Sequence, residues 1–276
     1  MKLIADSGST KTSWALADGM GAVRITTAGI NPAVQTEATI EQTLSMLRMQ
    51  MPRGASEIYF YGAGCRGEAS LRMEKCLRET FPDAAKICVE SDLLGAARAL
   101  FGSEEGIACI LGTGSNSCLY DGKSIVANVP PLGYILGDEG SGAALGKMFF
   151  NALFKGDLPE ELKDMYLDET HQTYDDVIRC VYREPNANRY LASTSLFVAN
   201  HLDVKLLTDI VEQNIEQFFQ RNVCKYKRSD LPVAAVGSIA FSYIDIFNKV
   251  AAHHGFRVAK VIKQPIEALV DYHAER

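Results

Sequence analysis

Two segments of this chain place a turn rich in glycine, serine and threonine between two short apolar runs. The first extends from Leu3 to Ala17 and the second from Ile107 to Tyr120, and each is predicted to form strand, turn and strand. Glycine reaches backbone angles that other residues adopt only with strain, so such a turn can aim N–H groups and hydroxyls at one phosphate. The repetition indicates two half-domains that bind the same polyphosphate.

The first turn reads D-S-G-S-T-K-T and offers a carboxylate, hydroxyls and one ammonium group together. Asp6, at the end of the first strand, can hold Mg²⁺ through water. The candidate phosphate ligands of this turn are Gly8, Ser9, Thr10, Lys11 and Thr12. The alternative is an ordinary hairpin in which Asp6 and Thr10 bond turn amides. A Walker loop is excluded, because a strand rather than a helix is predicted to follow.

Asp92 lies between a predicted strand at Lys86–Glu90 and a predicted helix at Ser91–Phe101. The positive end of a helix dipole stabilises an ionised carboxylate, which can then accept a proton from an attacking hydroxyl. Asp92 is therefore the candidate general base. The competing interpretation is structural, with Ser91 or Asp92 serving only as the helix cap.

Asp138 and Glu139 stand between two glycines in a loop that precedes another predicted helix. Carboxylates accept bidentate hydrogen bonds from the hydroxyls of a ligand, and a loop can present them to it. The alternative is that both are solvated or assist the helix cap, for which Ser141 is the candidate.

The elements around these residues alternate between strand and helix, which predicts an α/β fold with parallel strands. A helix is expected where Ile40, Leu44, Leu47 and Met51 recur at helical spacing. The pattern restarts at the second turn, so two domains are favoured over one. Residues 159–202 are polar and read as a mostly helical insertion.

The 276 residues have an ordinary globular composition and a net charge of −6. Basic residues cluster only at 224–228, which disfavours nucleic acid as the main partner. No stretch has the length or apolarity of a membrane span or a secretory signal, so a cytoplasmic location is expected. Seven scattered cysteines without a C-x-x-C pair are expected to be small core residues, and zinc has no sequence support.

The ordered motifs D-S-G-S-T-K-T, S-D-L-L-G-A-A-R-A, L-G-T-G-S-N-S, L-G-D-E-G-S-G and A-V-G-S-I-A resemble the BadF/BadG/BcrA/BcrD ATPase family. Within it, the chain is most similar to N-acetylglucosamine kinases of the actin, Hsp70 and sugar-kinase superfamily. The resemblance spans nearly the whole chain, apart from the insertion.

The resemblance implies two ribonuclease-H-like, actin-like ATPase domains with ATP in the cleft between them. Residues 1–104 would form the N-terminal domain and residues 105–264 the C-terminal one, with a final helix at 265–276 packed back on the first. Two domains around a cleft suggest hinge closure upon sugar binding, which would protect ATP from water, and the resemblance implies a homodimer.

By motif, the resemblance also assigns roles to individual residues. The second phosphate turn would comprise Gly112, Thr113, Gly114 and Ser115. Gly237 and Ser238 would lie against the adenosine, although Ser238 stands where the family usually has a second glycine. Asp138, Asn31 and Asn116 would contact the sugar, although a plain turn before Pro32 is the alternative for Asn31.

The resulting prediction is an ATP- and Mg²⁺-dependent kinase that converts an amino sugar, N-acetylglucosamine first, to its 6-phosphate. Glucosamine is the nearest alternative substrate. A nucleotide- or sugar-binding sensor without catalysis and a dehydratase-activating ATPase are the alternative functions. For the latter, Cys65 and Cys88 would have to serve as iron–sulfur ligands, but the sequence has no paired ligand pattern.

Overall fold

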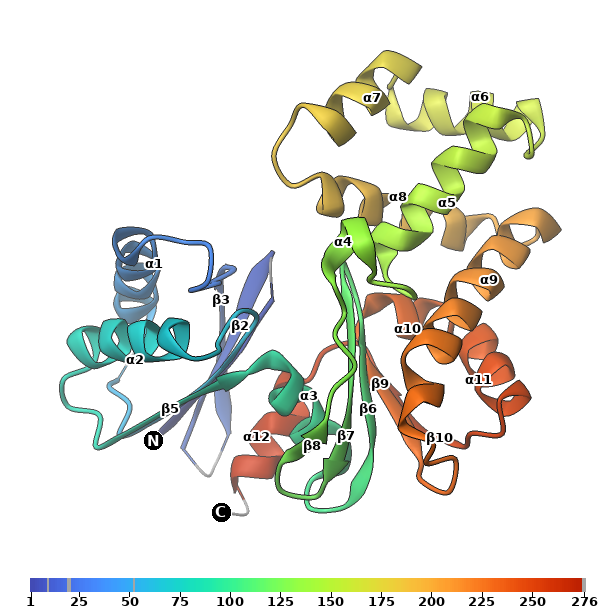
Figure 1. Cartoon of the computed structure of the whole chain (residues 1–276). Coiled ribbons are helices and arrows are strands. Elements are labelled where there is room, and N and C mark those ends of the chain that lie inside the picture. The colour runs from blue at the N-terminus through green and yellow to red at the C-terminus, as the bar shows by residue number, and fades with distance from the viewer. Residues whose placement is uncertain (9, 19–20, 52, 275–276) are drawn as a thin grey trace. The chain divides into compact units, whose positions relative to one another are not determined.

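The computed structural model describes residues 1–8, 10–18, 21–51 and 53–274. It divides into two compact units, coloured along the chain in Figure 1. Unit 1 comprises Met1–Glu104, Tyr120–Ile125 and Gln264–Arg276, and unit 2 comprises Glu105–Leu119 and Val126–Lys263. Ser9, a predicted phosphate ligand, lies outside the described residues.

Unit 1 is built on one mixed sheet in the order β3-β2-β1-β4-β5. Its strands are β1 Lys2–Ser7, β2 Lys11–Ala17, β3 Ala22–Ala28, β4 Glu57–Gly62 and β5 Lys86–Ser91. Its helices are α1 Glu37–Gln50, α2 Glu68–Thr80, α3 Asp92–Phe101 and α12 Ile266–Ala274. The strands β1, β2 and β3 pair antiparallel, whereas β1, β4 and β5 run parallel.

Unit 2 repeats this arrangement. Its strand order, read from the other edge, is β8-β7-β6-β9-β10, which corresponds strand by strand to β3-β2-β1-β4-β5 of unit 1. The strands are β6 Glu105–Leu111, β7 Ser115–Asp121, β8 Ile125–Ala127, β9 Val233–Val236 and β10 Val258–Ile262. The helices are α4 Gly133–Leu136, α5 Gly142–Lys155, α6 Glu160–Thr170, α7 Tyr174–Tyr182, α8 Ala187–Asn200, α9 Lys205–Arg221, the 3₁₀ turn Val223–Tyr226, α10 Ser238–Ser242 and α11 Ile244–His253. The predicted repeated α/β fold is confirmed.

Alternation along β4 explains how both faces of the unit 1 sheet are covered. Ile58 and Phe60 are fully buried in the core that includes apolar residues of α1 and α2. Tyr59 and Tyr61 point to the other face, as period-two side chains must, and both contact the His273 ring of α12. The helices α1 and α2 pack together, as do α3 and α12 (Figure 1).

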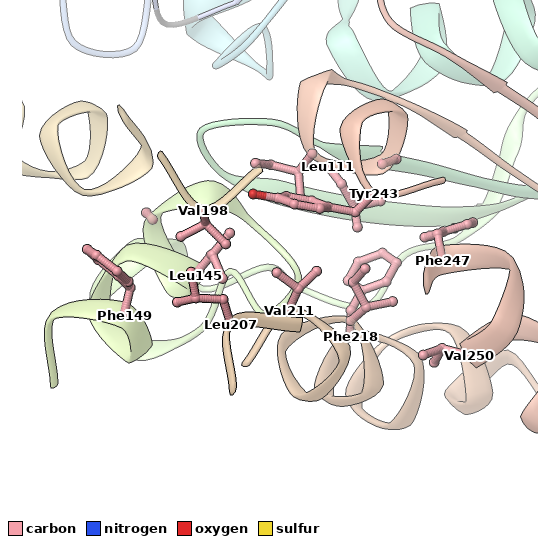
Figure 2. Close-up of a cluster of buried hydrophobic side chains, with 14 of the residues drawn as sticks. Leu111, Leu145, Phe149, Val198, Leu207, Val211, Phe218, Tyr243, Phe247 and Val250 are labelled. Carbon is pink, nitrogen blue, oxygen red and sulfur yellow. The ribbon is translucent and has the colours of Figure 1, made fainter. Parts of the chain in front are cut away.

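The unit 2 core lies under its glycine-rich turn, where Leu111 ends β6. Figure 2 shows Leu111 in one cluster with Phe218 of α9 and with Tyr243, which follows α10. All three side chains are at most 1 % exposed. The turn after Leu111 is therefore mounted on close-packed, rigid elements.

The sequence pattern missed two short elements and merged two others. β8 and α4 were not expected, because three or four residues carry too little periodicity to read. The sequence between Ser238 and Gly255 predicts a single helix, whereas the structure has α10 and α11 there. The 159–202 region contains α6, α7 and α8, as its mostly helical pattern predicted.

Gly146 allows α5 to approach α8 closely, and we expect Gly146→Ala to destabilise the protein. A Cβ there would lie 2.1 Å from the Leu191 carbonyl oxygen, so the helices must separate. Overpacking of this kind costs about 1–3 kcal/mol, although alanine has the better helix propensity. Urea denaturation measures the loss, with Gly54→Ala, which meets nothing within 4 Å, as control. Unchanged or raised stability would contradict this packing.

Candidate active site

The carboxyl ends of three parallel strands bring the acidic candidates of unit 1 to one sheet edge. Ser7 of β1 pairs in register with Gly62 of β4, which pairs with Ser91 of β5. Asp6 precedes this row and Asp92 follows it. Only β4 lies between β1, which carries Asp6, and β5, after which Asp92 begins α3, and adjacent strands lie about 4.8 Å apart.

Asp6 sits in surroundings that penalise its negative charge. Burial raises its carboxyl pKa from 3.8 to about 7, the negative charge of Asp92 adds to the rise, and Lys11 opposes it. Among the described residues no hydrogen bond to this carboxyl group is found. A desolvated, hard oxygen donor beside a second carboxylate fits a hydrated Mg²⁺ ion.

Asp92 is not the cap of its helix, which removes the main structural alternative for it. Ser91 is the N-cap of α3, and its hydroxyl accepts from the Leu94 amide at 3.2 Å. The Asp92 Oδ1 accepts from the adjacent Leu93 amide at 2.9 Å. Burial raises the Asp92 pKa, while that amide and the Arg66 charge lower it. The group is thus positioned at the helix start with its proton affinity increased, as a general base requires.

The first phosphate turn uses part of its own hydrogen-bonding capacity to hold its shape. The Gly8 amide donates to the Lys11 carbonyl at 3.0 Å, closing the hairpin. The Thr12 hydroxyl is fully buried and bonds the Ser7 hydroxyl at 2.6 Å. Both hydroxyls also accept from the Ile30 amide. Thr10 and Lys11 are exposed and available to a ligand, whereas Gly8 and Thr12 support the turn.

Asn31 is held next to the turn that follows β4. Its Oδ1 accepts from the Ala33 amide at 3.0 Å, and a Cβ at Gly64 would lie 2.1 Å from that oxygen. Cys65 lies in the same turn, and burial together with the negative charge of Asp92 raises the pKa of its thiol. Asn31 is therefore positioned beside the turn that follows β4, a segment to which the sequence motifs assign no role. The pair of glycines at the end of β4, Gly62 and Gly64, could have indicated this turn.

The second phosphate turn lies on the first turn of α5. Gly112 and Thr113 accept backbone bonds from Gly142 and Ala143 at 2.8 and 3.1 Å. The Gly112 amide donates to the Gly114 carbonyl, which tightens the turn. Within the described part of the chain, the Thr113 and Gly114 amides have no partner. They are the donors that this turn can direct at a phosphate oxygen.

Asp138 is held against this turn in a strained conformation. Its φ is +57°, a left-handed angle that costs a residue with a side chain about 1–2 kcal/mol. A Cβ at Gly114 would lie 2.9 Å from its Oδ2. Burial raises the Asp138 pKa to about 6. The hydrogen bond from the Ser115 amide and the positive charge of Lys147 act in the opposite direction and lower it. Strain of this kind at a buried carboxyl group points to a functional role.

Glu139 follows Asp138 and has partners of its own. Its backbone carbonyl accepts from the Ser115 hydroxyl at 2.7 Å, which ties the loop to the phosphate turn. Its carboxylate lies 3.6 Å from the Arg221 guanidinium of α9. Ser115 is therefore a brace between turn and loop, while the Glu139 carboxylate is partly neutralised.

Gly237 brings the third predicted motif of unit 2 to the same place. Its φ is +128°, and a Cβ there would lie 2.2 Å from the Leu111 carbonyl oxygen. Only glycine permits this approach. Ser238, the first residue of α10, is therefore positioned close to the start of the Gly112–Ser115 turn.

Two hollows on the helical side of unit 2 are separate from these residues. One, of about 540 Å³, is lined by α5, α9 and the loop after α5; the other, of about 850 Å³, by α5 to α8. None of the predicted site residues lines either hollow. Within the described residues, no helix is long and apolar enough to cross a membrane, and no group of three metal-ligating side chains is found.

Because the sequence motifs assign Asp138 to a sugar and this turn to a nucleotide, we expect Gly114→Ala to impair sugar use more than nucleotide use. The added methyl group would displace the Asp138 carboxylate, because 2.9 Å is shorter than a real Cβ contact. The turn itself has no left-handed angle at Gly114, so the fold should tolerate alanine. Steady-state kinetics should show the sugar KM rising at least about tenfold. A larger change in the ATP KM would contradict this role.

The chain is similar over its whole length to solved structures. A protein from Porphyromonas gingivalis, proposed to be an N-acetylglucosamine kinase, has 44% identity, a TM-score of 0.94 and coverage of 100% of this chain and 99% of its own. A second proposed N-acetylglucosamine kinase, from Chromobacterium violaceum, has 20% identity, a TM-score of 0.78 and 98% coverage of both chains.

A more distant similarity is to a ROK-family glucokinase from Streptomyces griseus in complex with glucose and AMPPNP. It has 14% identity, a TM-score of 0.59 and coverage of 99% of this chain and 98% of its own. At this identity the likeness concerns the fold. Comparison with protein-family models and with curated proteins gave no match.

Proposed function

This chain belongs to the sugar-kinase family of the Porphyromonas gingivalis protein, and we propose that it transfers the γ-phosphoryl group of ATP to the primary hydroxyl of N-acetylglucosamine. The product would be the 6-phosphate. The ordered sequence motifs further support a position in the BadF/BadG/BcrA/BcrD branch.

The observation that carries the proposal is the row formed by the ends of β1, β4 and β5 with two desolvated carboxyl groups, Asp6 and Asp92. A purely structural acid would be paired or exposed. Both groups instead have raised proton affinity, which is typical of acids and bases that act in catalysis.

Asp92 would take the proton of the attacking hydroxyl as the bond from the sugar oxygen to the γ-phosphorus forms and the bond from that phosphorus to the β,γ-bridging oxygen breaks, which releases ADP. Its carboxyl group accepts from the Leu93 amide and is influenced by the Arg66 charge, and its two oxygens keep acceptor capacity for a hydroxyl. Asn31, held beside Gly64, would bind another sugar hydroxyl. Lys11 and the Thr10 amide would contact phosphate oxygens.

In unit 2, the Thr113 and Gly114 amides would receive phosphate oxygens. Asp138 would orient sugar hydroxyls, and Ser115 and Glu139 would hold it through the loop. Gly237 and Ser238 would lie against the adenosine. Phosphoryl transfer depends mainly on positioning and charge neutralisation, which these fixed groups supply.

Asp6 would hold Mg²⁺ through water, with Asp92 as the neighbouring carboxylate. When bound, the ion would neutralise phosphate charge. The positive charge of Lys11 would partly compensate the negative charge of Asp6 near the same turn, since it lowers the Asp6 pKa.

A coupled ADP-release assay tests the proposal with N-acetylglucosamine, glucosamine, N-acetylmannosamine and glucose. The expected result is sugar-dependent ADP formation that is fastest with N-acetylglucosamine and is abolished by EDTA. Saturable sugar binding without ADP formation would favour a sensor. Faster turnover with glucosamine would identify glucosamine as the substrate in place of N-acetylglucosamine.

A dehydratase-activating ATPase is less well supported. Burial raises the Cys65 pKa to about 12, so this thiol stays protonated instead of acting as a thiolate ligand. All seven cysteines are free, which suits a reducing compartment and supports a cytoplasmic location.

We also propose that the two units correspond to the two ribonuclease-H-like domains, and that the protein forms a homodimer, as the sequence resemblance implies.

A further inference from the structure

The larger hollow of unit 2, of about 850 Å³, is walled by the helices α5 to α8. Within this group α5 contacts α6 and α8, and α7 contacts α8 (Figure 1). Pockets that bind small organic ligands have volumes of about 300–1,000 Å³, so the hollow is large enough for one. None of the residues assigned to phosphate, sugar or adenosine lines it.

The apolar face of α7 is directed at this hollow and not at a closed core. Tyr174, Val177, Ile178, Val181 and Tyr182 recur at helical spacing, and all five line the hollow. Among these five only Val177 is buried, whereas Tyr174 and Tyr182 are 53% and 77% exposed. Because an amphipathic helix is stabilised mainly by burying its apolar face, α7 retains apolar surface that a ligand can cover.

The helix α5 contributes aromatic rings that hold one another in place. Phe150 and Phe154 stack with their ring centroids 5.9 Å apart and their planes at 16°. Phe150 also stacks on Tyr190 of α8 at 5.8 Å, and Phe154 meets the Tyr174 ring edge-on at 5.0 Å. The rings are therefore fixed before a ligand binds, which lowers the entropic cost of binding.

The charged side chains that line the hollow are all positive. They are Lys147, Lys155 and Lys163, and none of the described lining residues is acidic. The Lys147 ammonium group donates to the Tyr134 carbonyl at 2.5 Å, and Lys163 pairs with Glu160. For Lys155, at the end of α5, no hydrogen bond or ion pair is found in the part of the chain that the structure describes. Lys155 is thus the cation that remains for a negatively charged ligand.

We propose that this hollow binds an aliphatic carboxylate, whose alkyl chain lies against the apolar residues of α5 and α7 and whose carboxylate pairs with Lys155. The lining residues of α5 extend from Lys147 to Lys155, about 12 Å at 1.5 Å per residue, which matches an extended chain of about ten carbons. A cationic head group would meet only like charge here. The inference does not depend on the proposed kinase activity, because the two sets of residues are separate.

Isothermal titration of the whole chain with sodium decanoate, below the concentration at which it forms micelles, tests the site. We expect one saturable site per chain. Decyltrimethylammonium, which combines an alkyl chain of the same length with the opposite charge, should bind at least about tenfold more weakly. Absence of saturable decanoate binding, or equal affinity for the two compounds, would overturn the inference.

Ile178→Trp locates the alkyl chain by filling the hollow from the apolar face of α7. Decanoate affinity should fall at least about tenfold, because the indole occupies space that the chain needs. Leu196→Trp, at a residue of α8 that is 70% exposed and does not line the hollow, should leave the affinity unchanged. If Ile178→Trp instead converts a dimer to a monomer without changing decanoate affinity, a second copy of the chain covers the hollow and the inference is wrong.

Lys155→Glu locates the carboxylate and keeps the inference testable if Ile178→Trp fails to fold, since Lys155 is exposed. Loss of a charged hydrogen-bond partner should lower decanoate affinity at least about tenfold and bring it closer to that for decyltrimethylammonium. Lys225→Glu, the same exchange at an exposed lysine away from the hollow, is the matched control. Equal effects of Lys155→Glu and Lys225→Glu would contradict the proposed pairing.

Discussion

Asp92→Asn is expected to lower kcat for sugar phosphorylation by about 10²–10⁴-fold, the range that a positioned general base contributes. The amide cannot accept the hydroxyl proton, although its oxygen can still accept the Leu93 amide bond. The ATP KM should change less than kcat, because the role proposed for Asp92 is proton transfer and not phosphate binding. Single-turnover ADP release with saturating sugar measures the chemical step.

The matched control is Ser91→Ala, the adjacent residue. Loss of its hydroxyl removes the N-cap bond to Leu94, which costs about 1 kcal/mol, and should leave kcat nearly intact. If Ser91→Ala and Asp92→Asn lower kcat equally, then Asp92 acts only by holding α3. A full-speed Asp92→Asn enzyme would remove the general base from the mechanism.

Asp92→Asn should also stabilise the protein at neutral pH. Burial raises the Asp92 pKa in the folded state, so the folded chain keeps the proton to a higher pH than the unfolded chain. Stability from this group is full below the unfolded pKa and decreases as pH rises through the folded one. An amide has no charge to desolvate. Lost activity with raised stability would distinguish a functional acid from a structural one.

The features that sequence reasoning predicted well are local ones. The two turns were readable because glycine, serine and threonine interrupt two short apolar runs, and the structure has hairpin strands on each side of the first. Ser141 was readable as a cap, and its hydroxyl accepts from the Ala144 amide at 3.0 Å. Such signals act within a few residues of the chain, so spacing alone exposes them.

The features that could not be predicted depend on residues far apart in the chain. Thr12 is a phosphate ligand by motif, yet its hydroxyl is buried against Ser7 and the Ile30 amide. The bond between Asn128 and Asn116 crosses a hairpin whose second strand, β8, is too short to predict. No spacing rule shows which hydroxyl the tertiary structure turns inward.

Desolvation of the acids is the property least visible in sequence. Asp6 and Glu139 are both acids in polar motifs, but the Asp6 carboxyl group is buried near Asp92, and no hydrogen bond to it is found in the described residues. Glu139 faces Arg221 instead. The environment that raises the Asp6 pKa depends on the pairing of strands β1, β4 and β5, and thus on the completed sheet.

Asp6→Asn is expected to reduce Mg²⁺-dependent turnover at least about a hundredfold and to stabilise the protein above pH 7. Moving the Asp6 pKa from 3.8 to about 7 corresponds to at most about 4 kcal/mol. Because the folded pKa is the higher one, wild-type stability should fall as pH rises from about 4 to about 7. The asparagine variant should lack this part of the decline.

Urea denaturation between pH 4 and 8, in EDTA and without nucleotide, isolates the Asp6 contribution from metal binding. The stability curves of wild type and Asp6→Asn should approach one another at pH 4 and separate towards pH 8, with the variant the more stable. Adding Mg²⁺ and ATP should reverse the order, because only the wild type gains binding free energy through its carboxylate. Parallel curves across this range would mean that Asp6 is solvated in the folded protein, and the proposed metal site would lose its physical basis.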